Sequence, residues 1–222
     1  MNRSLVAMTM AGLLTGGAAM ADDSGHRGVR EFDITITNIT PGIIYTPLMV
    51  ATHSPRIAMF HLGQPASDEL AVLAEGGDTA PLTAKLVATG ETLDAVTAPG
   101  LLGPGASVTV RIRANGRFDR LSIAGMLLPT NDGFVAINSY DLPWDRRSVT
   151  LTALGYDAGS EPNDERCASI PGPQCGGAGN SPGSGGEGFV HIHNGIHGFA
   201  DLTASTYNWR NPVALVTIRR VD

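Results

Sequence analysis

Two loops combine carboxylates with glycine and asparagine: TNDGF at residues 130–134 and YDAGSEPNDE at residues 156–165. Glycine and asparagine favour tight turns that leave oxygen atoms exposed, so neither loop resembles a solvated run of charge. Brought together at one edge of a β-sandwich, the loops would form an oxygen-rich site for a hard cation such as calcium. The alternative is that Asp132 and Asp157 cap their own turns through Asx hydrogen bonds.

A second candidate for metal chemistry is the segment HIHNGIH at residues 191–197, which holds half of the six histidines. On a strand, His191 and His193 would share a face, and imidazoles are ligands for zinc and copper. Asn194-Gly195 is typical of a tight β-hairpin, and a two-residue hairpin places His197 on the other face. A transition-metal site of His191, His193 and His197 therefore needs a looser turn. We favour a hydrogen-bonded histidine cluster that braces a hairpin.

Catalytic motifs are absent from the sequence. It contains no G-x-S-x-G elbow, P-loop, dinucleotide fingerprint or H-E-x-x-H pattern. We therefore predict that the protein is not an enzyme, and we keep a hydrolase of unknown substrate as an alternative class.

The N-terminus predicts export. A positive start at Arg3, an apolar stretch over residues 5–19 and the cleavage pattern Ala19-Met20-Ala21 indicate a signal peptide over residues 1–21. We expect residues 22–29 to be disordered and residues 30–222 to form one domain. No later segment has the length and apolarity of a membrane span. We therefore expect a periplasmic or secreted protein.

Charge and cysteine content agree with that location. The formal net charge of −6 argues against nucleic acid and anionic membranes as partners. Cys167 and Cys175 lie eight positions apart in a loop rich in proline, glycine and serine. In an oxidising compartment this spacing predicts a local disulfide, with two free thiols as the alternative.

Hydrophobic periodicity predicts an all-β fold with a short helical insertion. Phe32, Ile34 and Ile36 alternate with polar residues, as on a half-buried strand. Ser67 is a candidate helix N-cap, followed by acidic residues and ended by Gly76-Gly77. Further strands are expected over residues 43–52, 107–114, 121–128, 134–138, 148–154 and 213–221, and a second short helix over residues 81–88.

Several segments, in this order, resemble the spondin domain at the N-terminus of the animal matrix proteins F-spondin and mindin. They are FDITITNIT, TPLMVATH, LAEGGDTAPL, SIAGMLLPTNDGF, YDAGSE and NPVALVTIRR. The resemblance extends from Glu31 to Val221 and is strongest to the form that stands alone in exported bacterial proteins. It implies a C2-like antiparallel β-sandwich with a calcium ion at one end.

The resemblance also implies which residues hold calcium. Asp132 matches the ligand from the first loop of the family, and Asp157 and Glu161 match those from the second. Glu161 stands where animal members have aspartate, and Gly133 replaces an aromatic residue. The expected function is a calcium-binding adhesion module for an extracellular protein or glycan; the alternative is a periplasmic copper- or zinc-binding protein that uses HIHNGIH.

Overall fold

The structure is a computed structural model that describes residues 28–145, 147–180 and 185–221. The predicted signal peptide, over residues 1–21, and most of the segment 22–29 lie outside the described residues. The strands are β1 (Arg30–Asn38), β2 (Ile44–Tyr45), β3 (Met49–His53), β4 (Thr92–Thr97), β5 (Ser107–Ala114), β6 (Arg120–Leu128), β7 (Gly133–Asp141), β8 (Val149–Asp157), β9 (His191–Ile192) and β10 (Ala214–Arg220). The helices are α1 (Asp68–Gly76), α2 (Ala80–Ala88), the 3-10 turn η2 (Cys167–Ser169) and α3 (Ala204–Tyr207).

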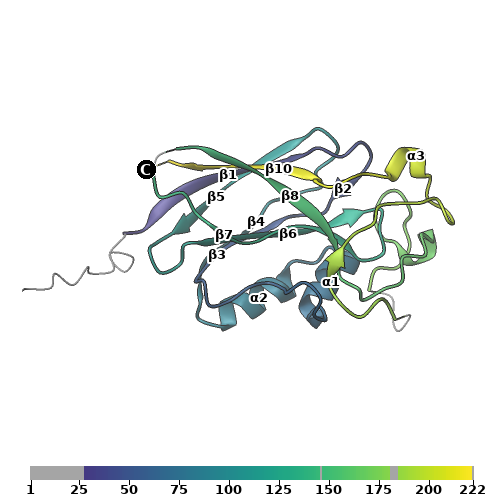
Figure 1. Cartoon of the computed structure of the whole chain (residues 1–222), viewed down its shortest axis with the longest axis horizontal. Helices are drawn as coiled ribbons and strands as arrows, with labels where there is room; N and C mark the ends of the chain where they lie inside the picture. Colours follow the sequence, from purple (N-terminus) through teal and green to yellow (C-terminus); the bar gives the residue numbers. More distant parts are fainter. Residues whose placement is uncertain (1–27, 146, 181–184, 222) are drawn as a thin grey trace, which may run out of the picture.

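The main strands form one antiparallel sheet in the order β4-β3-β6-β7-β8-β10-β1-β5. The sheet folds over on itself, so that β1, β5 and β10 lie above β6, β7 and β3 (Figure 1). Its two edge strands approach each other, and Arg113 on β5 pairs with Asp94 on β4 at 3.1 Å. The result is a β-sandwich that nearly closes into a barrel, which confirms the predicted all-β class.

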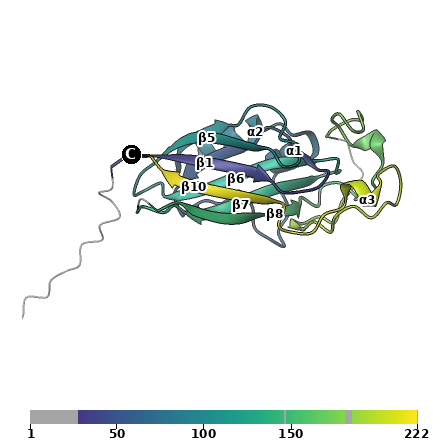
Figure 2. The same cartoon turned by 90° about the horizontal axis from the view of Figure 1, so that it is seen from above.

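One apolar core lies between the two layers and includes Phe32, Ile34 and Ile36, all fully buried. These are the residues whose alternation predicts β1, and their polar neighbours point outward. The closing strand β10 pairs with both β1 and β8, as its alternating sequence predicts. The first and last strands thus lie side by side in the upper layer (Figure 2).

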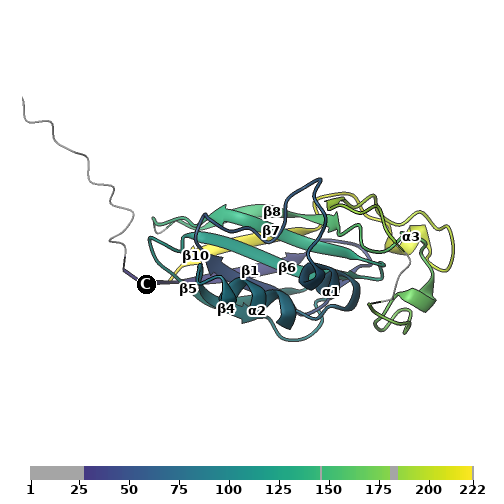
Figure 3. The same ribbon diagram turned by 90° about the horizontal axis from the view of Figure 1, so that it is seen from below.

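A second apolar core lies between the lower layer and the helices α1 and α2, which cover its outer face (Figure 3). Leu70 and Leu73 of α1 and Leu82 and Leu86 of α2 are buried there. Because β6 has apolar cover on both faces, its residues from Leu121 to Leu128 are all buried, in agreement with its apolar sequence. Ser67 caps α1 as predicted, accepting from the Leu70 N–H at 3.4 Å.

Two predicted elements differ in the structure, and one strand was not predicted. The strand expected over residues 43–52 divides into β2 and β3 around Pro47, which cannot donate to a sheet ladder. Sequence analysis missed β4, an edge strand of mostly half-buried residues without a clear apolar face. The hairpin predicted at Asn194-Gly195 is wrong: β9 pairs with β8, and the residues that directly follow Gly195 form no strand.

Candidate functional site

The two acidic loops meet at one end of the sandwich, where the green-to-yellow loops and α3 gather in Figures 1 and 3. TNDGF joins β6 to β7, and YDAGSE begins with the last two residues of β8. The antiparallel register pairs Gly133 with Asp157. Asp132 is therefore one residue beyond the ladder on β7, beside the C-terminal end of β8.

Asp132 is fully buried and fastens the first loop to the second. Its Oδ2 accepts hydrogen bonds from the backbone N–H groups of Ser160, at 2.8 Å, and Glu161, at 3.0 Å. Its Oδ1 is buried and has no hydrogen-bond partner among the described residues. Burial, followed by the neighbouring Asp157 carboxylate, raises the pKa of Asp132 to about 7, because both disfavour its charged form.

Asp157 is also fully buried, and both of its carboxylate oxygens accept hydrogen bonds. Oδ1 accepts from the Gly159 N–H at 2.7 Å, an Asx turn, and Oδ2 accepts from Asn163 Nδ2 at 2.6 Å. Burial raises the pKa of Asp157 above its ordinary value, although the hydrogen bonds from Asn163 and Gly159 act in the opposite direction. Asp157 thus caps its own turn, as the alternative interpretation predicts, whereas Asp132 accepts hydrogen bonds from the second loop.

The turn after Asp157 requires glycine. Gly159 has a φ of +67°, and a Cβ atom there would lie 2.4 Å from the carbonyl oxygen of Phe189. The Gly159 carbonyl accepts from the Gly188 N–H at 2.8 Å. The segment just before β9 therefore packs directly on the second acidic loop.

Glu161, the third predicted ligand, is buried at the same end and only 1% exposed. It does not, however, form a close trio with Asp132 and Asp157. Among the described carboxylate, imidazole and thiol groups, the trio whose ligand atoms all lie within 4.8 Å of one another is Asp157, Glu187 and His191. The calcium assignment to Asp132, Asp157 and Glu161 thus stays a prediction.

The three histidines of residues 191–197 occupy different environments. His191 is half-buried beside Asp157, whereas His197 is exposed and stacks on Phe199 with ring centroids 5.3 Å apart. His193 is buried against Trp209, and its Nδ1 accepts from the Gly195 N–H at 2.9 Å. Burial lowers the pKa of His193 to about 3, so its ring is neutral. The three imidazoles form no close trio among the described residues.

Two acidic residues at this end were assigned no role from the sequence: Glu187, and Glu165, the last residue of the second acidic loop. Glu187 is a lone acid in a glycine-rich run, four residues before His191, and this spacing was its only signal. The Glu165 carboxylate is buried and accepts from the backbone N–H groups of His197, Gly198 and Phe199 at 2.6 to 2.8 Å. It holds the loop after β9 against the acidic loops.

The predicted disulfide between Cys167 and Cys175 is confirmed.

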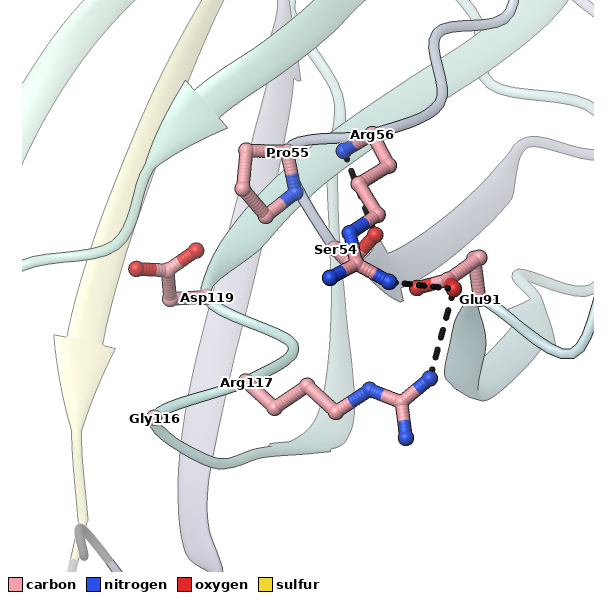
Figure 4. A pocket seen from close by; sticks show the side chains of 7 residues that line it. All are labelled: Ser54, Pro55, Arg56, Glu91, Gly116, Arg117 and Asp119. Carbon is pink, nitrogen blue, oxygen red and sulfur yellow. Dashed lines mark hydrogen bonds and ion pairs between the residues drawn. The ribbon is translucent and has the colours of Figure 1, made fainter. Parts of the chain in front are cut away.

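A larger cavity lies elsewhere. It measures about 480 Å³ and lies at the other end of β6, where Arg56 and Arg117 both pair with Glu91 (Figure 4). Its charges largely neutralise one another. A smaller cavity of about 130 Å³ adjoins the acidic loops and is lined by Asn163, Glu187 and His193 among others. We place the candidate site at the acidic loops because Asp132 and Asp157 are both fully buried there and Asp132 Oδ1 has no hydrogen-bond partner among the described residues.

Comparison with known families identifies the class of protein. The family model Spondin_N matches residues 37–164, more than half of the chain, and the chain therefore belongs to the spondin N-terminal domain family. This membership supports a spondin-like extracellular binding module. The match includes Asp132, Asp157 and Glu161 and ends before Glu187 and His191.

A particular relative is human Spondin-2, which is 25% identical to this chain over 184 residues. The alignment covers 72% of this chain and 55% of Spondin-2, so the chain spans about half the length of that relative. Among the described residues, no helix is long and apolar enough to cross a membrane.

Proposed function

We propose that this protein is an exported, non-catalytic binding module that holds a calcium ion with Asp132, Asp157 and Glu161. The ion fixes the two acidic loops, and the loop end of the sandwich presents them to an extracellular protein or glycan. The family membership supports the binding-module class, and the buried carboxylates support the ion.

The observation that carries the proposal is the environment of Asp132. Two fully buried aspartates lie side by side, and Asp132 Oδ1 has no hydrogen-bond partner among the described residues. Buried carboxylates are stable as anions only when a cation or sufficient hydrogen bonds compensate their charge. Calcium prefers oxygen ligands in flexible geometry, and the chemistry of this donor set fits it.

The chain's own hydrogen bonds orient these donors. Ser160 and Glu161 donate to Asp132 Oδ2, while Asn163 and Gly159 donate to Asp157. Each carboxylate is thus held in one orientation before an ion arrives. Bound calcium would supply the positive charge that these buried groups lack.

Isothermal titration calorimetry of the metal-free protein with calcium tests the proposal. We expect saturable binding of one ion in the wild type and loss of that binding in Asp132→Asn and Glu161→Gln. Asp68→Asn, in the first turn of α1, is the matched control and should bind as the wild type does. Wild-type protein that binds no calcium would refute the proposed function.

A further inference from the structure

We propose that Asp157, Glu187 and His191 form a separate site for a transition-metal ion of the zinc class. This site differs from the three-histidine site considered from the sequence, because it uses one imidazole and two carboxylates. It shares Asp157 with the proposed calcium site, but Glu187 and His191 belong to this site alone.

The spacing of the three ligand atoms supports a metal ion. His191 Nε2 lies 3.4 Å from Asp157 Oδ1 and 3.7 Å from Glu187 Oε2. Two ligands about 2.0–2.1 Å from a tetrahedral zinc ion lie roughly 3.3–3.4 Å from each other. The observed separations are longer than good hydrogen bonds and close to the ligand-to-ligand spacing of such a site.

The orientation of His191 leaves a lone pair for the ion. Its Nδ1 lies 3.0 Å from the backbone carbonyl of Ile192, and only a protonated Nδ1 can donate to that oxygen. In the neutral imidazole, Nε2 is then the unprotonated nitrogen. It is buried and has no hydrogen-bond partner among the described residues. Metal-binding histidines commonly carry this kind of supporting hydrogen bond.

Asn163 orients both carboxylates. Its Nδ2 donates to Asp157 Oδ2 at 2.6 Å and lies 3.3 Å from Glu187 Oε1. The remaining oxygens, Asp157 Oδ1 and Glu187 Oε2, are those close to His191 Nε2. One amide thus selects which oxygen of each carboxylate faces His191, as groups hydrogen-bonded to metal ligands do at known metal sites.

The site is open on one side. The Asp157 side chain is fully buried, whereas those of His191 and Glu187 are 21% and 39% exposed. Three protein ligands with a remaining open position are typical of zinc sites that accept water or a ligand from another molecule. Imidazole nitrogen is a common ligand of zinc, whereas calcium prefers oxygen ligands only. One imidazole with two carboxylates therefore suits zinc better than calcium.

A proton competes with the metal ion for His191 Nε2. Partial burial lowers the pKa of His191, but the hydrogen bond to Ile192 and the charges of Asp157 and Glu187 outweigh it, so the pKa lies above its ordinary value. An imidazolium ion pair would also hold the three side chains together. A test must therefore detect the metal directly.

Zinc titration of metal-free, tag-free protein at pH 7.5 provides the test. We expect one zinc ion per chain, affinity reduced about 100-fold in His191→Gln and Glu187→Gln, and about 10-fold in Asn163→Ala. His197→Gln is the matched control and should retain wild-type affinity. Absence of zinc binding, or a loss in His197→Gln that matches that in His191→Gln, would overturn the proposal.

Two further measurements keep the result interpretable. Zinc-edge X-ray absorption of the wild-type complex should show one imidazole and otherwise oxygen ligands, whereas two or three imidazoles would contradict the assignment without any variant. Glu161→Gln should lose calcium and keep zinc, and His191→Gln should lose zinc and keep calcium. Failure of one site is thereby distinguished from failure of the other.

Discussion

The backbone N–H of Glu161 donates to Asp132 Oδ2 at 3.0 Å. The first predicted calcium ligand therefore holds the loop that carries the third. One oxygen of Asp132 serves the fold in this way, and the other, Oδ1, is buried without a hydrogen-bond partner among the described residues. The structural and cation-binding roles of this side chain can thus be separated by mutation.

Asp132→Asn should separate them. The carboxamide oxygen can still accept from Ser160 and Glu161, but the buried negative charge next to Asp157 is removed. We expect the metal-free variant to be more stable than the metal-free wild type, by about 1–3 kcal/mol. The reason is that a buried negative charge beside a second carboxylate destabilises the folded state. Urea unfolding in EDTA measures this difference.

The same variant should gain no stability from calcium, whereas the wild type should gain it by mass action. Asp68→Asn serves as the control and should respond to calcium as the wild type does. An Asp132→Asn protein that calcium stabilises as strongly as the wild type would show that Asp132 only holds the second acidic loop in place.

Glu165→Ala should loosen the loop after β9. The substitution leaves three backbone N–H groups, those of His197, Gly198 and Phe199, without their acceptor. We expect a loss of about 1–3 kcal/mol in the free energy of unfolding. Hydrogen exchange should accelerate at these three amides before it changes in β1 or β10. Unchanged exchange at His197–Phe199 would contradict this role for Glu165.

His53 should make stability depend on pH. It is fully buried, with Nδ1 2.8 Å from the Ser54 carbonyl and Nε2 2.7 Å from Ser122 Oγ. Burial lowers its pKa below the ordinary value of 6.5; nearby Arg120 acts in the same direction, while the Ser54 hydrogen bond and Asp119 oppose the shift. In the acid range the unfolded chain therefore binds a proton that the folded protein excludes.

The contribution of His53 is fully present above about pH 6.5 and is lost as the pH falls towards the lowered pKa of the folded state. Denaturant titrations between pH 5 and 8 should show this loss, and His53→Gln should reduce it. His61→Gln, at an exposed position, is the control. An identical pH dependence in wild type and His53→Gln would exclude His53 as the source.

The disulfide between Cys167 and Cys175 should stabilise the loop that follows the second acidic segment. Its closed loop is short, so we expect the double Cys→Ser variant to lose about 2–3 kcal/mol through greater freedom of the unfolded chain. Chemical denaturation measures the loss, and reduction of the wild type should reproduce it. Equal stability of reduced and oxidised protein would contradict this expectation.

The sequence predicts the sandwich well where one strand face is buried. In β1 and β10 the alternation of apolar and polar residues is clear, because one face lies on the core and the other faces water. The same reasoning fails for β4, whose residues are almost all half-buried. It also fails at Asn194-Gly195, where the contact of His193 with Trp209 and the hydrogen bond from the Ile196 N–H to Asn208 Oδ1 replace a hairpin.

The candidate site is predictable from the sequence only where its residues lie beside regular strands. Asp132 and Asp157 lie next to paired strands, so the register alone brings them together. Glu187 and Glu165 lie in a long irregular segment, and no periodicity places such residues in space. Their positions depend on hydrogen bonds formed over sequence separations of 24 residues or more, such as Asn163 with Glu187.

A crystal structure of the protein in calcium, with anomalous difference maps, would show directly whether the ion binds at the acidic loops. We expect one calcium peak within about 2.3–2.6 Å of oxygens from Asp132, Asp157 and Glu161. Calcium soaks that leave this position without a peak, or a peak that lies away from Asp132, would contradict the proposed binding module.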